Sequence, residues 1–283
     1  MGIVVGPNQY GKAENRVVRI VRDTARHEIS DLNVSTSLHG DFAAAHTDGD
    51  QSQVLPTDTQ KNTAFAFAKK VGIASPEDYA LALARRLVDA TPAATGAIVK
   101  VDEYAWDRIV VDGTGHDHSF VRRGGEVRTT EITLEEGAAT VVSGLKDLTV
   151  LRSTGSEFKG FLKDEFTTLL EADDRILATA LTARWRYADR DWIEWNAAYD
   201  SVRALLLATF ATTYSRALQE TLYAMGRAVL ETHAEIAEIS FVAPNKHHFL
   251  VDLAPFGLEN PGEVFIAADR PYGLIEATVT RDD

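Results

Sequence analysis

The sequence predicts an α+β fold of two tandem ββααββ units with antiparallel sheets. Short runs rich in Val, Ile and Thr alternate apolar with polar residues, which is typical of strands with one buried face. Longer runs place apolar residues three and four positions apart, as amphipathic helices do. Because the helices come in pairs between pairs of strands, this order favours α+β over parallel βαβ units.

The first unit is expected over residues 1–137. One helix is expected to begin near Lys61, after a polar loop at 40–53, and a second has Ser75 as its N-cap, followed by a proline. The clearest strand is 31–38, in which alternate residues share one face: Leu32, Val34, Thr36 and Leu38. The strands of this unit are expected at 14–22, 31–38, 96–104 and 126–134.

The second unit is expected over residues 138–283 and repeats this order without convincing sequence identity to the first. Its helices are expected at 191–210 and 212–232, and its strands at 139–152, 175–187, 236–253 and 273–281. The second helix has Leu218, Leu222, Met225 and Val229 on one face. Two such sheets leave strand edges that need covering, so we expect the chain to form a homo-oligomer.

Composition narrows the function. Of 283 residues, 45% are hydrophobic, which allows a substantial core, and the formal net charge of −13 argues against nucleic acid as a partner. No apolar run reaches the roughly eighteen residues of a membrane span, and we expect neither a signal peptide nor a peroxisomal Ser-Lys-Leu address. The sequence has no cysteine, which excludes disulfides, thiolate metal sites and a cysteine nucleophile, and which fits a reducing cytoplasm.

Three short segments concentrate polar side chains beyond the needs of caps and turns. Lys12 is a candidate base if burial and a hydroxyl partner disfavour its ammonium form, and otherwise it is a solvated lysine at a strand end. Thr57 is the candidate hydroxyl, although Thr57 and Asp58 could equally belong to a loop or a helix cap. The segments are Gln9-Tyr10-Gly11-Lys12, Pro56 to Thr63, and Pro244-Asn245-Lys246-His247-His248-Phe249.

If the last segment is a strand, Asn245, His247 and Phe249 share a face and His248 points the other way, so the adjacent histidines make a poor metal pair. His116 and His118 have better ligand spacing, but no cluster of carboxylates and histidines supports them. We therefore expect no metal site.

These segments, together with Ser153-Thr154-Gly155-Ser156-Glu157-Phe158, resemble the site segments of the urate oxidases (the uricase family). The match follows the family's order along almost the whole chain, and residues 70–115 match loosely. The resemblance implies two tandem tunnelling-fold (T-fold) domains that assemble into a homotetramer of barrels, with active sites at subunit interfaces. It also implies oxidation of urate by O2 to 5-hydroxyisourate and hydrogen peroxide, without a metal or organic cofactor.

The resemblance assigns the proton chemistry to three residues. It implies that Lys12 and Thr57 form a proton-relay dyad across a subunit boundary, with His247 as a proton shuttle beside them. Asp58 would orient the substrate and its loop. Asn245 would hydrogen-bond the dioxygen or water above the purine.

The resemblance assigns urate binding to Phe158, which would stack on the ring, and to Arg175 and Gln219, which would hold its edge. Leu218 would add a backbone N–H. The residues alone leave other roles open: packing for Phe158 and Leu218, a surface ion pair with the preceding acids for Arg175, and a solvated helix position for Gln219.

Two other functions stay open at this point. One is an enzyme of the same fold that acts on a pterin or another purine. Such relatives often use a metal held by Cys and His, so the missing cysteines weaken this option. The other is a non-catalytic purine-binding T-fold protein.

Overall fold

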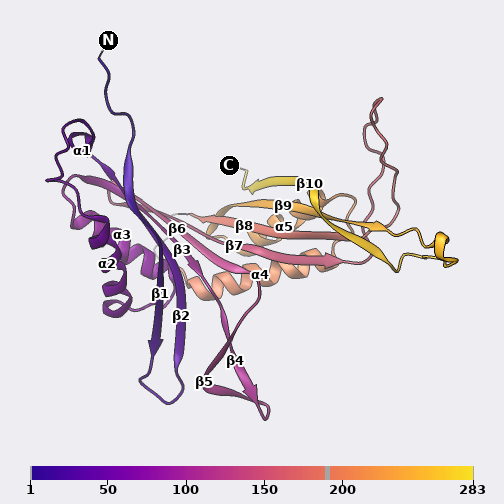
Figure 1. The fold of residues 1–283 in the computed structure, drawn as a ribbon, viewed down its shortest axis with the longest axis horizontal. Helices are drawn as coiled ribbons and strands as arrows, with labels where there is room; N and C mark the ends of the chain where they lie inside the picture. The colour runs from indigo at the N-terminus through magenta and orange to yellow at the C-terminus, as the bar shows by residue number, and fades with distance from the viewer. Residues whose placement is uncertain (1, 189–191, 283) are drawn as a thin grey trace. The chain divides into compact units, whose positions relative to one another are not determined.

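The computed structural model describes residues 2–188 and 192–282, which form two compact units (Figure 1). Among these residues, unit 1 comprises 2–144 and 192–196, and unit 2 comprises 145–188 and 197–282. Each unit has an antiparallel sheet with helices packed on it, so the predicted α+β class and the repeated ββααββ order are confirmed. No helix of the described residues combines the length and hydropathy of a membrane crossing.

Unit 1 contains the first repeat and an additional hairpin. Its elements are β1 (Gln9–Val21), β2 (Glu28–Gly40), α1 (Ala43–Thr47), α2 (Thr57–Lys70), α3 (Pro76–Asp89), β3 (Ala94–Glu103), β4 (Trp106–Val111), β5 (Thr114–Arg122) and β6 (Val127–Glu135). The strand order is β1-β2-β3-β6, so β1 is an outer strand. Helix α2 packs on β1, and α3 packs on β3 and β6.

Strand β2 supplies much of the core of unit 1. Leu32, Val34 and Leu38 are fully buried, and Thr36 is nearly so, as the alternation predicts. The Thr36 hydroxyl donates to Oε1 of the fully buried Gln60 in α2 at 2.9 Å. This bond ties β2 to α2 inside the core.

The helices of unit 1 begin in two ways. Helix α3 begins as predicted, because Oγ of Ser75 accepts the N–H of Asp78 at 3.0 Å. Helix α2 begins at Thr57 and not near Lys61, with Pro56 at the N-cap and no side-chain cap. Capping therefore does not explain the polar side chains in the first turn of α2.

The hairpin of β4 and β5 was not predicted. Its two-residue turn is Asp112-Gly113, and both residues have positive φ (50° and 79°), as tight hairpins require. Val110 and Val121 remain 65% and 53% exposed, so the strands lack the contrast between a buried and a wet face that reveals strands in a sequence. The Asp-Gly pair was the available signal.

Unit 2 contains the second repeat. The elements of this repeat are β7 (Ala138–Arg152), β8 (Leu177–Tyr187), α4 (Trp195–Thr212), α5 (Leu218–Thr232), β9 (Ile236–Leu250), the 3-10 turn η1 (Ala254–Phe256) and β10 (Phe265–Thr280). The first two residues of α4, 195–196, belong to unit 1. The strand order is β7-β8-β9-β10, and α5 packs on β9 and β10. The predicted apolar face of α5 is buried. The predicted helix start at residue 191 lies outside the described residues, and α5 begins at Leu218, later than the expected residue 212.

The boundary between the repeats was expected between residues 137 and 138. The Glu136-Gly137 turn between β6 and β7 lies there, with φ of 48° and 87°. The compact units divide later, after Gly144, inside β7. Strand β7 therefore contributes its first part to unit 1 and its remainder to unit 2.

Candidate functional site

The first site segment lies in β1 of unit 1. Residue 11 must be glycine, because a Cβ there would lie 1.8 Å from the carbonyl oxygen of Thr36 in β2. Lys12 pairs with Thr36, and directly after it the β1–β2 register shifts at a bulge before Asn15. The Lys12 side chain is half-buried. Close strand approach and a bulge thus set the position of this lysine.

Lys12 lies near the start of α2. The hydrogen bond and charge of Lys61 lower the pKa of the exposed Asp58 carboxyl, and the charge of Lys12 lowers it further. Thr57 is half-buried in the same turn as Asp58. The charge of Lys12 therefore acts on the turn that contains Thr57 and Asp58.

In unit 2, Phe158 and Arg175 come from two loop segments that pair with each other. The N–H of Phe158 donates to the carbonyl of Ala172 at 2.8 Å, and the reverse bond is 3.0 Å. The N–H of Arg175 donates to the carbonyl of Ser156 at 2.7 Å. As a result the guanidinium lies 4.9 Å from the centroid of the Phe158 ring, which stacks on Phe161 at 5.0 Å.

Arg175 is a half-buried cation whose Nε is buried without a hydrogen-bond partner. Burial also lowers the pKa of its guanidinium. The surface ion pair that the sequence left open is not the arrangement seen: Asp173 pairs with Lys159 at 2.9 Å, and Asp174 accepts bonds from residues 154–156. A half-buried guanidinium whose Nε has no acceptor is a candidate group for binding an anion.

The start of α5 is fixed to the same loop. The N–H of Ser215 donates to the carbonyl of Gly155 at 3.0 Å, and the Ser215 hydroxyl accepts from Thr221 in the first turn of α5 at 2.8 Å. Leu218 is the first residue of α5 and is buried, whereas Gln219 is exposed. The first N–H groups of a helix have no acceptor within it, so they can bind a ligand.

Asn245 and His247 are half-buried in β9. The rings of His247 and Phe249 lie 5.8 Å apart between centroids, which confirms that these alternate residues share a face. Asn245 pairs with Thr179 of β8 and with Gly273 of β10, and the β9–β10 register shifts between Asn245 and His247. Bulges of this kind often lie beside active sites, where they redirect side chains.

The expected site residues fall into two groups, one in each unit. Unit 1 holds Lys12, Thr57 and Asp58, and unit 2 holds Phe158, Arg175, Leu218, Gln219, Asn245 and His247. The sequence did not reveal that Asp174 and Ser215 hold the loop at 154–156 in unit 2. The small polar composition of residues 153–156 was the available signal, since such a loop needs acceptors for its backbone N–H groups.

His116 and His118 make a ring contact with centroids 4.5 Å apart. Within residues 2–188 and 192–282, no group of three or more His, Asp or Glu side chains could hold a metal ion.

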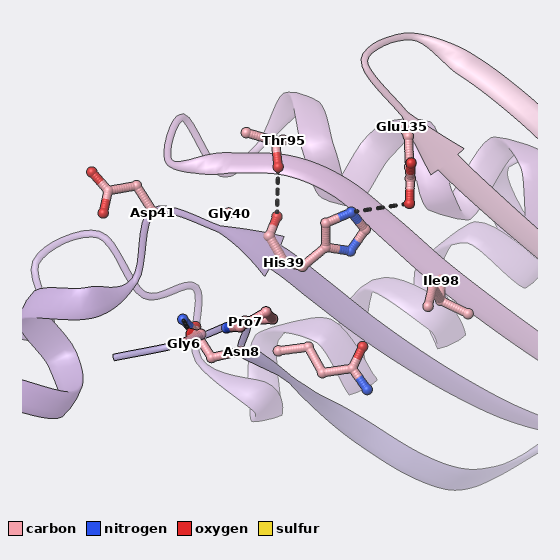
Figure 2. A pocket seen from close by; sticks show the side chains of 10 residues that line it. Gly6, Pro7, Asn8, His39, Gly40, Asp41, Thr95, Ile98 and Glu135 are labelled. Carbon is pink, nitrogen blue, oxygen red and sulfur yellow. Dashed lines mark hydrogen bonds and ion pairs between the residues drawn. The ribbon is translucent and has the colours of Figure 1, made fainter. Parts of the chain in front are cut away.

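A cavity of about 750 Å³ in unit 1 is formed by residues 6–9 with parts of β2, β3 and β6 (Figure 2). Nε2 of His39 lies 3.8 Å from Oε1 of Glu135, and the Thr95 hydroxyl donates to the carbonyl of His39 at 3.4 Å. The lining does not include any of the expected site residues.

Comparison with known proteins gives consistent matches. The family model described as Uricase matches residues 8–133 and 141–276. The chain is 55% identical over 280 residues to the uricase of Arthrobacter globiformis, covering 99% of this chain and 91% of that protein. It is 38% identical to the uricase of Schizosaccharomyces pombe, with 96% of each chain covered. The crystal structure of the Arthrobacter globiformis uricase superposes with a TM-score of 0.95 at 54% identity, covering 100% of this chain and 96% of that one.

Proposed function

Because this chain belongs to the uricase family and is an enzyme that oxidises urate, we propose that it transfers two electrons from urate to O2 without a metal or organic cofactor. Urate loses two electrons and gains a hydroxyl group from water, giving 5-hydroxyisourate. O2 takes up the two electrons and two protons and leaves as hydrogen peroxide. Since the urate anion is itself electron-rich, the protein has to bind it, move its protons and hold O2 over the ring.

The observation that supports this proposal most directly is the buried Nε of Arg175, which has no acceptor. Urate presents an anionic edge that a planar guanidinium can bind. Phe158, whose ring lies 4.9 Å from that guanidinium, offers a face for stacking. Gln219 and the N–H of Leu218, at the start of α5, supply the remaining contacts to the edge of the ring.

We assign the proton transfers to Lys12, Thr57 and His247. The effect of the Lys12 charge on Asp58, the neighbour of Thr57, supports a relay between an amine and a hydroxyl, and a histidine suits a shuttle because imidazole ordinarily titrates near neutral pH. Asp58 orients the substrate and its loop. Asn245 holds O2 or water above the ring.

Because the chain as a whole is negatively charged, binding of the urate anion requires positive charge at the site itself. A formal net charge of −13 opposes the approach of an anionic substrate. Lys12 and Arg175 are the cations that the proposed site offers to offset this. Of the two, Arg175 is the one proposed to contact the urate edge, so urate affinity should depend mainly on Arg175.

We further propose that the chain forms a homotetramer with active sites at subunit interfaces. The outer strands β1 and β10 leave edges in their units that pairing between copies would cover and close into barrels. A reducing compartment such as the cytoplasm is the proposed location, because the sequence contains no cysteine.

The proposal is tested with Arg175→Ala in an oxygen electrode with urate. Loss of a charge-assisted pair should raise the KM for urate by about 30-fold or more. Arg227→Ala is the matched control, since Arg227 is an exposed arginine of α5 that pairs with Glu231 at 2.7 Å. An unchanged KM in Arg175→Ala would place the anion elsewhere, and urate binding by the unaltered chain without O2 uptake would exclude the oxidase reaction.

A further inference from the structure

Asp174 directly precedes Arg175, and its carboxylate is used by a different part of unit 2. Oδ2 accepts the hydroxyl of Thr154 at 2.6 Å, and Oδ1 accepts the N–H of Gly155 at 2.9 Å and that of Ser156 at 3.3 Å. All these donors belong to the loop that leads into Phe158. Asp174, beside Arg175, thus holds the loop at 154–156 that leads to Phe158.

The loop is shaped for this carboxylate. Gly155 has a φ of +74°, and this left-handed conformation lets the successive N–H groups of Gly155 and Ser156 converge on one oxygen as an anion-binding nest. The Thr154 hydroxyl, followed by the N–H groups of Ser156 and Gly155, lowers the pKa of the Asp174 carboxyl. The charged form of Asp174 is therefore the form that holds the loop at neutral pH.

The loop connects three segments that carry proposed urate contacts. The Ser156 carbonyl accepts the N–H of Arg175 at 2.7 Å, and the Gly155 carbonyl accepts the N–H of Ser215 at 3.0 Å, just before α5. Phe158 lies two residues after Ser156 in the same segment. A displacement of residues 154–156 would therefore move the ring, the guanidinium and the start of α5 relative to one another.

We propose that Asp174 is a positioning residue for urate: it holds residues 154–156 so that Phe158 and Arg175 keep the geometry that binds the ring. This inference rests on the urate-binding roles proposed above for Phe158 and Arg175. Asp174 acts through these residues and does not itself contact the substrate.

The first test compares Asp174→Ala, Asp174→Asn and the neighbouring control Asp173→Asn by steady-state kinetics with urate. Asp174→Ala should raise KM about tenfold with a much smaller change in kcat, because the bonds lost orient binding groups. Asp174→Asn should fall between it and the unaltered chain, since the amide keeps one acceptor oxygen. Asp173→Asn should leave both constants unchanged. A KM for Asp174→Ala equal to that of the unaltered chain overturns the proposal.

The second test is a double-mutant cycle that separates positioning from general stabilisation. In an Arg175→Ala background, Asp174→Ala should lower kcat/KM by clearly less than tenfold, because one of the two groups that it positions is already missing and only the effect through Phe158 remains. A full tenfold loss in that background would show that Asp174 acts independently of Arg175. If Arg175→Ala alone leaves KM unchanged, the proposed urate site itself fails, whereas a normal Arg175 effect with no Asp174 effect rejects only the positioning role.

Discussion

Among single residues, Arg175 shows most clearly that neighbours in the sequence need not be partners in the fold. Two acids precede it in the sequence, and either one could pair with it at the surface. Both are engaged elsewhere, Asp173 with Lys159 and Asp174 with the loop at 154–156, while Nε of Arg175 is buried without an acceptor. An unsatisfied buried donor costs free energy, and an anion that accepted this N–H would offset that cost.

Lys12 carries the first prediction at this scale. Lys12→Met keeps an unbranched side chain of nearly the same length and removes the amine, so turnover should fall about 100-fold or more while urate affinity is largely kept. The measurement is O2 uptake together with equilibrium binding of urate. Lys69→Met, at an exposed position in the last turn of α2, is the control. Unchanged turnover in Lys12→Met would remove Lys12 as the proton-transfer group.

At the scale of secondary-structure elements, a buried carboxylate anchors α3 in unit 1. Glu77 is fully buried in the first turn of α3, where a negative charge is favoured by the helix dipole. Its carboxylate accepts the hydroxyls of Thr130 at 3.0 Å and Ser143 at 2.6 Å and pairs with Arg128 at 2.7 Å. These partners lie in β6 and β7, so one side chain fastens the helix to two strands.

Glu77→Ala should therefore lower the free energy of unfolding by about 2–3 kcal/mol, because it leaves the hydroxyls and part of the largely buried Arg128 without an acceptor. Glu77→Gln should cost less, since the amide keeps an acceptor oxygen. Urea unfolding measures both. Glu231→Ala, in an exposed pair with Arg227, should change stability by no more than about 0.5 kcal/mol. Equal stabilities for Glu77→Ala and Glu231→Ala would contradict the anchoring role.

At the scale of the whole molecule, the grouping of site residues makes subunit sharing testable. Lys12 and the Thr57-Asp58 turn lie together in unit 1, whereas Phe158 and Arg175 lie in unit 2. A test for sites shared between subunits therefore combines one variant in unit 1 with one in unit 2. Two variants that both lie in unit 1 would damage the same group of site residues, so mixing them could not restore a complete site.

Lys12→Met and Arg175→Ala chains, mixed after reversible dissociation, should regain activity if each site combines unit 1 of one copy with unit 2 of another. Random pairing in a symmetric oligomer restores about a quarter of the sites. Mixing Lys12→Met with Thr57→Ala chains is the control and should restore none, since both changes fall in unit 1. Absence of recovery in the first mixture, with subunit exchange demonstrated, would assign each site to a single chain.

The sequence by itself determined the elements whose signals are local. The alternation of Leu32, Val34, Thr36 and Leu38 marked a strand with one buried face, and Ser75 marked the start of α3. The order of these elements was enough for the α+β class and its repeat. The resemblance to a family also rested on short local segments, and the family was confirmed. Such features depend on neighbours two to four residues apart, so they can be read directly from the chain.

Only the tertiary structure decided which groups meet. Asp174 binds Thr154 and Gly155, and Ser215 binds Gly155, although these partners are far apart along the chain. The start of α2 at Thr57 likewise has no side-chain cap that would mark it, and the hairpin of β4 and β5 is marked only by its Asp-Gly turn, because its exposed strands lack an apolar alternation. Backbone and carboxylate groups must find hydrogen-bond partners wherever packing brings them, and no short-range pattern encodes that choice.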